Sequence, residues 1–225
     1  MIKEKLKKYY FFRKIAKIIE LNRKRNTNLT VECYDIIKKV SVCFTQNEVR
    51  FFLDFGTLLG FVREGKLFSH DLDVDFGILP LTNPQEEKLK IRTILCGIGY
   101  QLKEYYCVNG DVKEETYVSK NAHFDVYYYE RDMNTNNLFC YIFCRIDGVH
   151  YNSKYEFSAG RYMYNIDIIP EHKRINGIDV MIPKNAEELL VLKYGATWRV
   201  PNKYWHYWYD SNVNDFGELG TIQIL

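Results

Sequence analysis

Apolar and polar residues alternate with two different periods along this chain, and the change of period predicts where it is helical and where it is extended. Apolar residues recur at helical spacing in the stretches 31–45, 84–98 and 186–194. A residue suited to capping a helix precedes each stretch, and Gly195 follows the last one. We therefore expect three helices in the body of the protein. The first helix is expected to bury Val31, Tyr34, Ile37 and Val40 to Val42. The second is expected to bury Leu89, Ile94, Leu95 and Ile98.

Between and after these helices, β-branched and aromatic residues predict extended segments. A strand over Val49–Phe55 leads into a turn at Gly56, and a second strand carries Asp73 and Asp75. Five more strands are expected at Gln101–Val108, Thr116–Ser119, His123–Tyr129, Leu138–Ile146 and Tyr162–Ile168.

Turn residues at Asn109-Gly110 and Asp147-Gly148 are consistent with hairpins. The polar tail from Ser211 is expected to be peripheral. Together these elements predict an α+β fold with a mixed, mostly antiparallel sheet flanked by helices.

Charge divides the chain into two unequal parts. Residues 1–28 contain ten Lys or Arg and two Glu, a net charge of +8, so the remainder carries −6 of the overall +2. The basic segment has an apolar stripe at helical spacing, which suits the surface of an anionic membrane. The same stripe could equally pack on the body or on a second copy. We expect an amphipathic arm over 1–28 and a catalytic domain over 29–225.

Composition narrows the possible settings and partners. None of the six cysteines forms a C-x-x-C pair and no signal-peptide pattern precedes them, so reduced thiols in the cytoplasm are expected. No apolar run reaches the ~18 residues of a membrane-spanning helix. The arm would place the protein at the inner face of the cell membrane. The acidic body lacks the basic track that nucleic-acid binding requires.

The segment Asp71-Leu72-Asp73-Val74-Asp75 is the first candidate for chemistry. In a strand these three carboxylates project from one face, where they repel one another unless a cation lies between them. Mg²⁺ binds through one or two carboxylates together with substrate phosphates. Upstream, a strand ends in a Gly56-Thr57 turn whose backbone can closely approach a phosphate, and a short helix start is expected to follow it. This layout suits phosphoryl transfer, although solvated aspartates on an edge strand would show the same pattern.

Together these residues resemble a known family. Gly56-Thr57-Leu58-Leu59-Gly60, an arginine three residues on and the D-x-D-x-D strand are similar to the LicD/fukutin family of the nucleotidyltransferase-like superfamily. The segment Tyr194-Gly195-Ala196-Thr197-Trp198-Arg199-Val200-Pro201 is similar to the Y-G-x-x-W-x-x-P element of that family. The resemblance covers roughly residues 30–205 and implies a nucleotidyltransferase-like core.

The resemblance implies a metal-dependent transferase. It would move a phospho-substituent, of the phosphocholine or phospho-alditol type, from a CDP-activated donor to a hydroxyl of a cell-surface glycan such as capsule or lipopolysaccharide. The metal, Mg²⁺ or Mn²⁺, would be held by the catalytic carboxylates Asp73 and Asp75 and by a third on a later strand. We favour Asp125 over Asp167 for the third, because the family pattern places it earlier in the chain. Asp71 remains a possible further ligand.

Donor binding is assigned to Gly56, Thr57, Arg63 and Lys193. The guanidinium fork of Arg63 suits a diphosphate, although it could instead pair with Glu64 or Asp71 at the surface. Arg199 is a weaker candidate for the same role. Asp54 could cap the turn, and no catalytic role is assigned to His70 or His123.

A cluster of aromatic residues follows the Y-G-x-x-W element. It could stack on a base or a sugar or enclose a quaternary ammonium group, although such runs are more often core or dimer contacts. Its members are Trp198, Tyr204, Trp205, Tyr207, Trp208 and Tyr209.

Two other functions fit the same motifs. A metal-dependent glycosyltransferase could use D-x-D to hold a nucleotide sugar, and a non-catalytic module could bind glycans or membranes. The first would release a nucleoside diphosphate rather than a monophosphate, and the second would show no turnover.

Overall fold

The computed structural model describes residues 29–69 and 73–225. The basic arm, His70 and Asp71 lie outside the described residues, so their assignments stay predictions. A helix over 29–46 opens the described chain. The elements that follow are β1 (Phe51–Leu53), α2 (Phe55–Glu64), β2 (Asp73–Ile78), α3 (Pro84–Gly97), β3 (Gln101–Val108), β4 (Asp111–Val118), β5 (His123–Tyr128), β6 (Glu130–Arg131), β7 (Leu138–Cys144), β8 (Glu156–Tyr164), β9 (Pro170–Ile175), β10 (Ile178–Pro183), α4 (Ala186–Tyr194) and β11 (Val213–Ile224).

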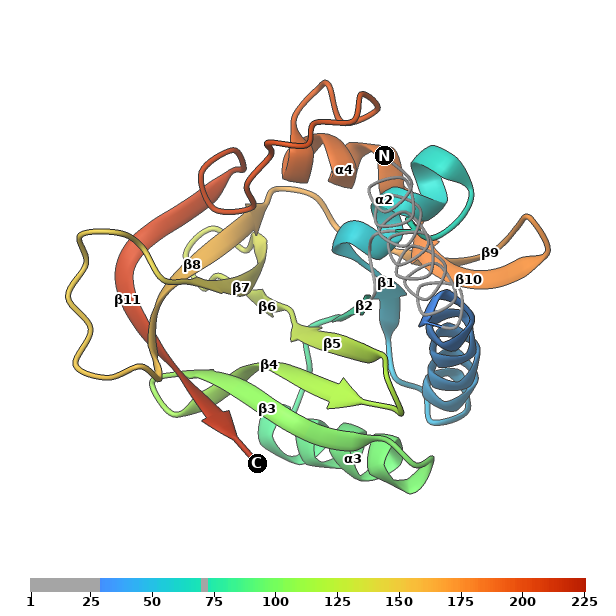
Figure 1. Cartoon of the computed structure of the whole chain (residues 1–225), viewed down its shortest axis with the longest axis horizontal. Coiled ribbons are helices and arrows are strands. Elements are labelled where there is room, and N and C mark those ends of the chain that lie inside the picture. Colours follow the sequence, from blue (N-terminus) through green and yellow to red (C-terminus); the bar gives the residue numbers. More distant parts are fainter. Residues whose placement is uncertain (1–28, 70–72) are drawn as a thin grey trace, which may run out of the picture.

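Nine of these strands form one sheet in the order β1-β2-β5-β4-β3-β11-β8-β7-β6. Only β2 and β5 pair in parallel, and every other neighbouring pair in this sheet is antiparallel. The sheet curves strongly, so that β7 returns over β4 and β5 and contacts both (Figure 1). The expected α+β fold with a mixed, mostly antiparallel sheet is confirmed.

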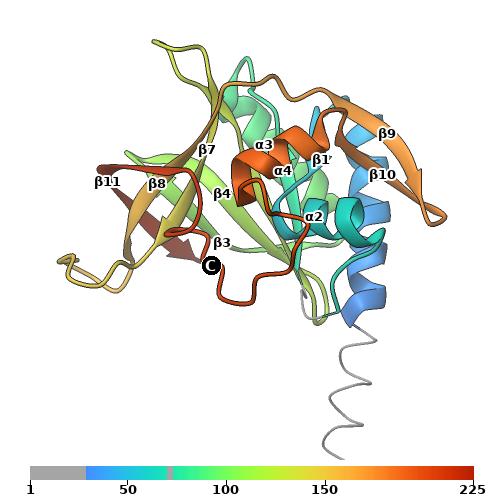
Figure 2. The same ribbon diagram turned by 90° about the horizontal axis from the view of Figure 1, so that it is seen from above.

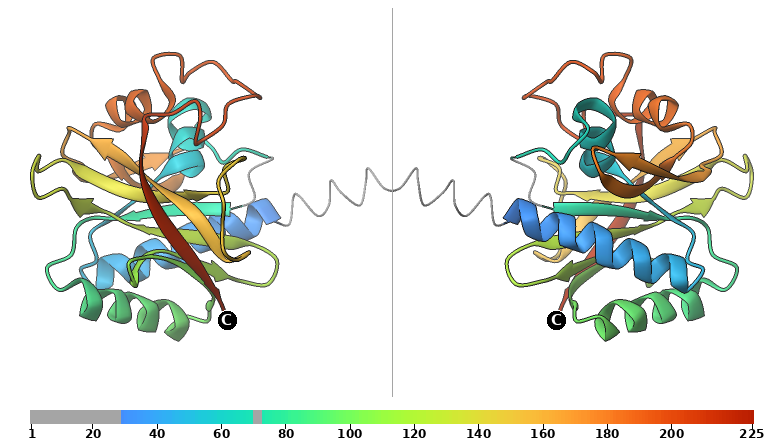
Figure 3. Two further views of the ribbon diagram at one scale, coloured as in Figure 1. Left: turned by 90° about the vertical axis from the view of Figure 1, so that its left-hand side faces the viewer. Right: turned by 90° about the vertical axis from the view of Figure 1, so that its right-hand side faces the viewer.

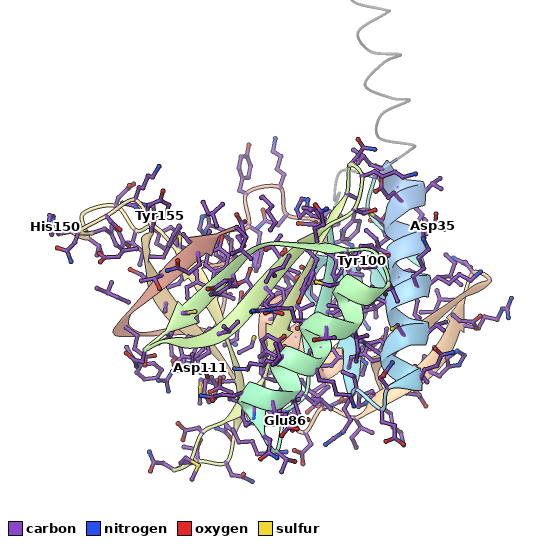
Figure 4. All side chains as sticks on the ribbon, turned by 90° about the horizontal axis from the view of Figure 1, so that it is seen from below. Asp35, Glu86, Tyr100, Asp111, His150 and Tyr155 are labelled. Carbon is purple, nitrogen blue, oxygen red and sulfur yellow. The ribbon has the colours of Figure 1, made fainter. Side chains whose placement is uncertain are left out.

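Helices cover the sheet from two sides. The helix over 29–46 and α3 lie on one side, and α2 and α4 lie on the other (Figure 3). Alternation along the strands directs apolar rings such as Phe76 and Phe124 toward the first of these layers, where Phe44 contacts Phe76 at a centroid distance of 5.9 Å. Tyr100, labelled in Figure 4, follows the end of α3 and packs on Phe124 at 4.9 Å. The residues that alternate with these rings are left to face the concave side.

The first predicted helix is correct in kind, but its buried face is only partly so. Val31 is 57% exposed and Val42 is 50% exposed, whereas Ile37 and Val40 are buried as expected. The buried stripe also includes Cys33, Ile36 and Phe44. Neighbouring apolar residues compete for one face, and only contact with the sheet decides which of them it buries.

Helix α3 begins at Pro84 as predicted, but its buried face also differs. Leu89 is 61% exposed and Ile98 is 38% exposed. The buried positions are Leu95, Ile91 and Lys88, whose ammonium donates to Asp111 and to the Val112 carbonyl. Hydrophobic periodicity does not count lysine as a buried residue, so the burial of Lys88 could not be predicted from it.

The first hairpin was read correctly from its turn. Asn109 (φ 51°) and Gly110 (φ 80°) both adopt the left-handed conformation and join β3 to β4. A second Asn-Gly pair, Asn176-Gly177, makes the hairpin of β9 and β10, which the sequence prediction missed.

The tail from Ser211 is not peripheral. Its residues form β11, which pairs with β3 on one side and β8 on the other and so joins the two halves of the sheet. The segment contains only scattered apolar residues, and its pairing satisfies backbone groups rather than burying a hydrophobic run. The prediction of a peripheral tail was therefore wrong. Among the described residues, no helix is long and apolar enough to cross a membrane.

Candidate active site

The acidic residues of the D-x-D strand meet those of β5 through the parallel pairing. In this register Asp75 lies beside Asp125 and Asp73 beside His123. Because alternate residues share a face, all four side chains belong to the concave side of the sheet. Asp73, His123 and Asp125 offer ligand atoms that all lie within 4.8 Å of one another. We call Asp73, Asp75, His123 and Asp125 the carboxylate shelf.

Asp75 is fixed by the start of α2. The Thr57 hydroxyl accepts a hydrogen bond from the Asp75 backbone N–H at 2.9 Å and lies 3.4 Å from its Oδ2. The Thr57 N–H is also 3.4 Å from this oxygen. Thr57 is buried, so it orients the carboxylate rather than contacting a ligand itself.

The predicted Gly-Thr turn is in fact the first turn of α2. The preceding strand ends at Leu53, Asp54 caps the helix by accepting the Phe55 N–H at 2.8 Å, and Phe55 has φ 40°. A left-handed non-glycine residue turns the chain within one step, which leaves no room for the longer strand that the sequence predicts. Gly56 therefore lines the pocket at a helix N-terminus, where partial positive charge favours an anion.

Asp125 and Glu114 experience the electrostatic cost of this arrangement. Burial, assisted by the negative charge of Asp73, raises the pKa of Asp125 to about 6, although Thr116 donates a hydrogen bond to it at 2.6 Å. Burial and the charges of Asp125 and Glu104 raise the pKa of Glu114 well above its usual value. Such perturbed carboxyls are typical of functional sites.

Glu114 was missed by the sequence interpretation. It lies outside the predicted strand Thr116–Ser119, whereas β4 begins at Asp111 and places Glu114 beside Tyr127 on the concave face. Among the described residues it has no hydrogen-bond or ion-pair partner, and it lines the pocket. The alternation Glu114-Thr116 on one face of a longer strand was the available signal.

A pocket of about 690 Å³ is lined by two residues of the shelf, Asp73 and Asp75, whereas His123 and Asp125 are not among its lining residues. Its sheet wall includes Asp73, Asp75 and Glu114, and β7 contributes Ile142 and Phe143. The remaining walls come from α2 and from the connection between α4 and β11, which both lie in front of the sheet when seen from above (Figure 2). These walls are lined by Phe55, Gly56, Leu59 and Arg63, and by Tyr194, Thr197, Trp198, Val200, Pro201, Asn202, Lys203, Trp205 and Tyr207.

Arg63 reaches this pocket from the last turn of α2. Its side chain is 14% exposed, and its guanidinium lies 4.6 Å from the centroid of the Phe68 ring. One amino group donates to the Trp198 carbonyl and the other approaches Glu64, both at 3.4 Å. The pairing with Glu64 is long, and the arginine is directed into the pocket wall rather than over the surface.

Lys193 does not reach the pocket, contrary to the sequence prediction. It is 1% exposed and pairs with the buried Asp54 at 2.7 Å, with its ammonium 3.4 Å from the centroid of the Phe55 ring. Tyr129 donates to the other oxygen of Asp54 at 2.6 Å. Lys193 therefore supports the start of α2 from behind, because the buried Asp54 charge requires a buried cation.

The other candidates lie away from the shelf. Asp167 is exposed and pairs with Arg131 at 2.6 Å, so the structure does not bring it to the carboxylates. Arg199 pairs with Glu187 at 2.5 Å and stacks on the Trp198 ring. Of the aromatic cluster, Trp198, Trp205 and Tyr207 line the pocket, whereas Tyr204 and Tyr209 are largely exposed.

Comparison with known proteins gives the site its family. A family model described as "LicD/FKTN/FKRP, nucleotidyltransferase domain" matches residues 48–185, more than half of the chain. The chain belongs to the LicD family. Its resemblance to the family, read from the motifs, is thereby confirmed, and the LicD domain makes it a glycan-modifying transferase in the broad sense.

Two other comparisons add little to this assignment. No curated protein matches the chain. Among solved structures, the crystal structure of ANT(2")-Ia in complex with adenylyl-2"-tobramycin is similar at 12% identity and a TM-score of 0.42. That similarity covers 77% of this chain and 80% of the other. It is distant, and nothing about the chemistry of the LicD-family chain rests on it.

The donor set of the shelf fits a divalent cation. Two carboxylates and an imidazole, with ligand atoms within 4.8 Å of one another, match the ligands of Mn²⁺ and, for the oxygens, of Mg²⁺. His123 adds a nitrogen that the sequence interpretation left without a role. Its Nε2 lies 3.7 Å from Asp73 Oδ2.

Proposed function

We propose that this LicD-family protein transfers a substituted phosphate from a CDP-activated donor to a hydroxyl of a cell-surface glycan, with Mg²⁺ or Mn²⁺ as the metal. The observation that carries the proposal is the carboxylate shelf, whose Asp73 and Asp75 line a pocket that also contains a helix N-terminus and Arg63. Carboxylates for a cation and donors for an anion on facing walls suit a metal-bound diphosphate. The phosphocholine or phospho-alditol type of substituent is carried by the family resemblance.

The residues divide into roles by position. Asp73, Asp125 and His123 would hold the cation, and Asp75, oriented by Thr57, would complete its surroundings. Once bound, the cation would offset negative charge on the diphosphate and the leaving nucleotide. Gly56 and Arg63 would orient the phosphates, and the aromatic rings of the α4–β11 connection would pack on the rest of the donor.

Glu114 is the best-placed group to take the proton of the acceptor hydroxyl. It lines the pocket, has no partner among the described residues and lies outside the proposed metal ligands. Removal from water raises its pKa well above the usual value, which brings it closer to the neutral range in which a general base works best. The hydroxyl oxygen would then form a bond to the phosphorus as the nucleotide departs.

The test is product analysis with a panel of CDP- and UDP-activated donors, in the presence of Mg²⁺ or Mn²⁺ and candidate glycans. The proposal predicts release of a nucleoside monophosphate and a glycan heavier by the substituted phosphate. Release of a nucleoside diphosphate would instead identify a glycosyltransferase. Absence of metal-dependent turnover with every donor would favour a non-catalytic binding module.

Arg63 provides a sharper test of donor binding. Arg63→Lys keeps the charge but loses the planar fork, so KM for the donor should rise about tenfold while the fold is unchanged. Arg199→Lys is the matched control, because Arg199 pairs with Glu187 at the surface. Unchanged kinetics for Arg63→Ala would remove this residue from the proposal.

The basic arm and the cytoplasmic face of the membrane belong to the same proposal. A net charge of +8 on residues 1–28 suits anionic lipids, with about 1 kcal/mol for each basic residue at the surface. Co-sedimentation with anionic and neutral vesicles, for the full chain and a chain starting at Asn28, tests this. Equal, salt-insensitive sedimentation of both would make the arm a packing element instead.

A further inference from the structure

Three buried N–H groups of residues that line the pocket have no acceptor in the described part of the chain. They are Nε of Arg63 and the indole nitrogens of Trp198 and Trp205. Only two other side-chain nitrogen or oxygen atoms in residues 29–69 and 73–225 share this property, and neither Ser41 nor Asn185 lines the pocket. The buried groups that lack a partner are therefore concentrated at one site, and those at the site are all donors.

An indole N–H without a partner is unfavourable in a folded protein. It has lost its hydrogen bond to water and gained none in return, a cost that a phenylalanine ring, which has no N–H, does not carry. Trp198 is 3% exposed, so in the ligand-free protein its indole contributes through ring packing and its N–H contributes no hydrogen bond among the described residues. This cost is recovered if a ligand supplies the acceptor.

The residues that carry the three groups line the same pocket. The Arg63 guanidinium donates to the Trp198 carbonyl at 3.4 Å, and the Trp205 ring lies 4.7 Å from that of Tyr194, at the end of α4. They come from α2 and from the α4–β11 connection, whereas the carboxylates come from β2, β4 and β5. A ligand held between these walls meets carboxylates on one side and the three unpartnered donors on the other.

We propose that Trp198 and Trp205, together with Arg63 Nε, form a subsite for the phosphate oxygens of the donor. Phosphate oxygens accept hydrogen bonds and donate none when ionised, which matches three donors with no acceptor among them. Small rotations of the indoles would expose the nitrogens as the ligand enters. The inference rests on the proposed function for the identity of the donor, but the subsite itself requires no turnover.

The experiment replaces each indole with a ring that lacks the N–H. Trp198→Phe and Trp205→Phe are compared with Trp208→Phe, whose tryptophan packs against Gly160 and does not line the pocket. Binding of inorganic pyrophosphate and of CDP is measured by calorimetry with EDTA present, so that neither metal nor glycan is involved. Urea unfolding of each ligand-free variant is measured in parallel.

We expect about tenfold weaker binding of pyrophosphate for Trp198→Phe and Trp205→Phe, and wild-type binding for Trp208→Phe. Urea unfolding serves to show that each ligand-free variant is folded, because the smaller ring removes buried volume and by itself lowers stability. Wild-type affinity in both pocket variants would overturn the inference.

The two proposals fail separately. If the wild-type protein binds pyrophosphate through these residues but turns over no CDP-activated donor, the subsite stands and the proposed function falls. If it transfers a substituted phosphate but both pocket variants bind pyrophosphate normally, the function stands and the subsite falls. Failure of the wild-type protein to bind pyrophosphate at all would also overturn the subsite.

Discussion

Glu114 and Glu115 are neighbours on β4, yet they project from opposite faces of the sheet into different surroundings. Glu115 is fully buried on the helical side, where Arg92 donates to it from α3 at 2.9 Å. The hydroxyls of Tyr117 and Tyr128 donate to its second oxygen at 2.6 and 2.8 Å. Burial and the Glu115 charge raise the pKa of both tyrosines, so these hydroxyls remain donors.

On the concave side the carboxylates are treated differently. Glu114 has no partner among the described residues, and Asp125 has one hydroxyl donor and a nearby Asp73. The pKa of both is raised, which means that the fold holds them at a cost. The same strand therefore carries one carboxylate, Glu115, that is fully supplied with donors and another, Glu114, that has none among the described residues. The contrast indicates that the helical face serves stability and the concave face serves binding.

The largest expected effect is on activity. Asp73→Asn, Asp75→Asn and Asp125→Asn should each lower kcat by about 10³-fold or more, because each removes charge from the proposed metal site without changing shape. The measurement is turnover with saturating Mg²⁺ or Mn²⁺. Asp167→Asn is the control and should remain active. Near wild-type turnover in any shelf variant would show that its carboxylate is not part of the site.

Glu115→Gln should have its effect on stability instead. It leaves Arg92 without its anion and weakens two tyrosine hydrogen bonds, so the free energy of unfolding should fall by about 2–3 kcal/mol. Arg92 is partly exposed and can be rehydrated, which limits the loss. Urea denaturation measures the change, and kcat per folded molecule should be unaffected. A stable but inactive variant would break the distinction between the two faces.

Glu114→Gln is the matched counterpart one residue away. It should lower kcat by about 10- to 100-fold, because the proposed proton acceptor is lost, while ligand-free stability stays equal or rises. The pH–rate profile should also lose the step that reflects the titration of Glu114, whose pKa is raised. If Glu114→Gln instead destabilises the protein as Glu115→Gln does, Glu114 has a structural role.

The smallest expected effect concerns pH. Asp125 has a pKa of about 6 in the folded protein against 3.8 ordinarily, so the folded state binds more protons than the unfolded state between these values. The contribution of Asp125 to metal-free stability should therefore fall as pH rises from about 4 to about 6, by about 1–2 kcal/mol. Urea midpoints in EDTA across this range test the direction. Relative to Asp125→Asn, the wild type should lose stability as pH rises and be the less stable of the two at pH 7, and an equal pH dependence of the two proteins would contradict the assignment.

The sequence alone determined the parts of the site that depend on local pattern. Alternation in Asp73-Val74-Asp75 places both carboxylates on one face, and the Asn109-Gly110 turn fixes a hairpin through its left-handed backbone. The cap at Asp54 and the start of α3 at Pro84 follow from the same short-range chemistry. Because these rules act within a few residues, they can be read without knowing what lies on the other side of the chain.

Only the tertiary structure decided which distant residues meet. The parallel register of β2 and β5 brings Asp125 beside Asp75, whereas Asp167 ends beside Arg131. The positive charge of Lys193 suggests a contact with phosphate, but in the structure Lys193 forms an ion pair with the buried Asp54. Register and burial arise from contacts between segments far apart in sequence, and a residue type carries no record of them. Within residues 29–69 and 73–225 neither Glu114 nor the Trp198 indole has a partner, and this too depends on every group that packs around them.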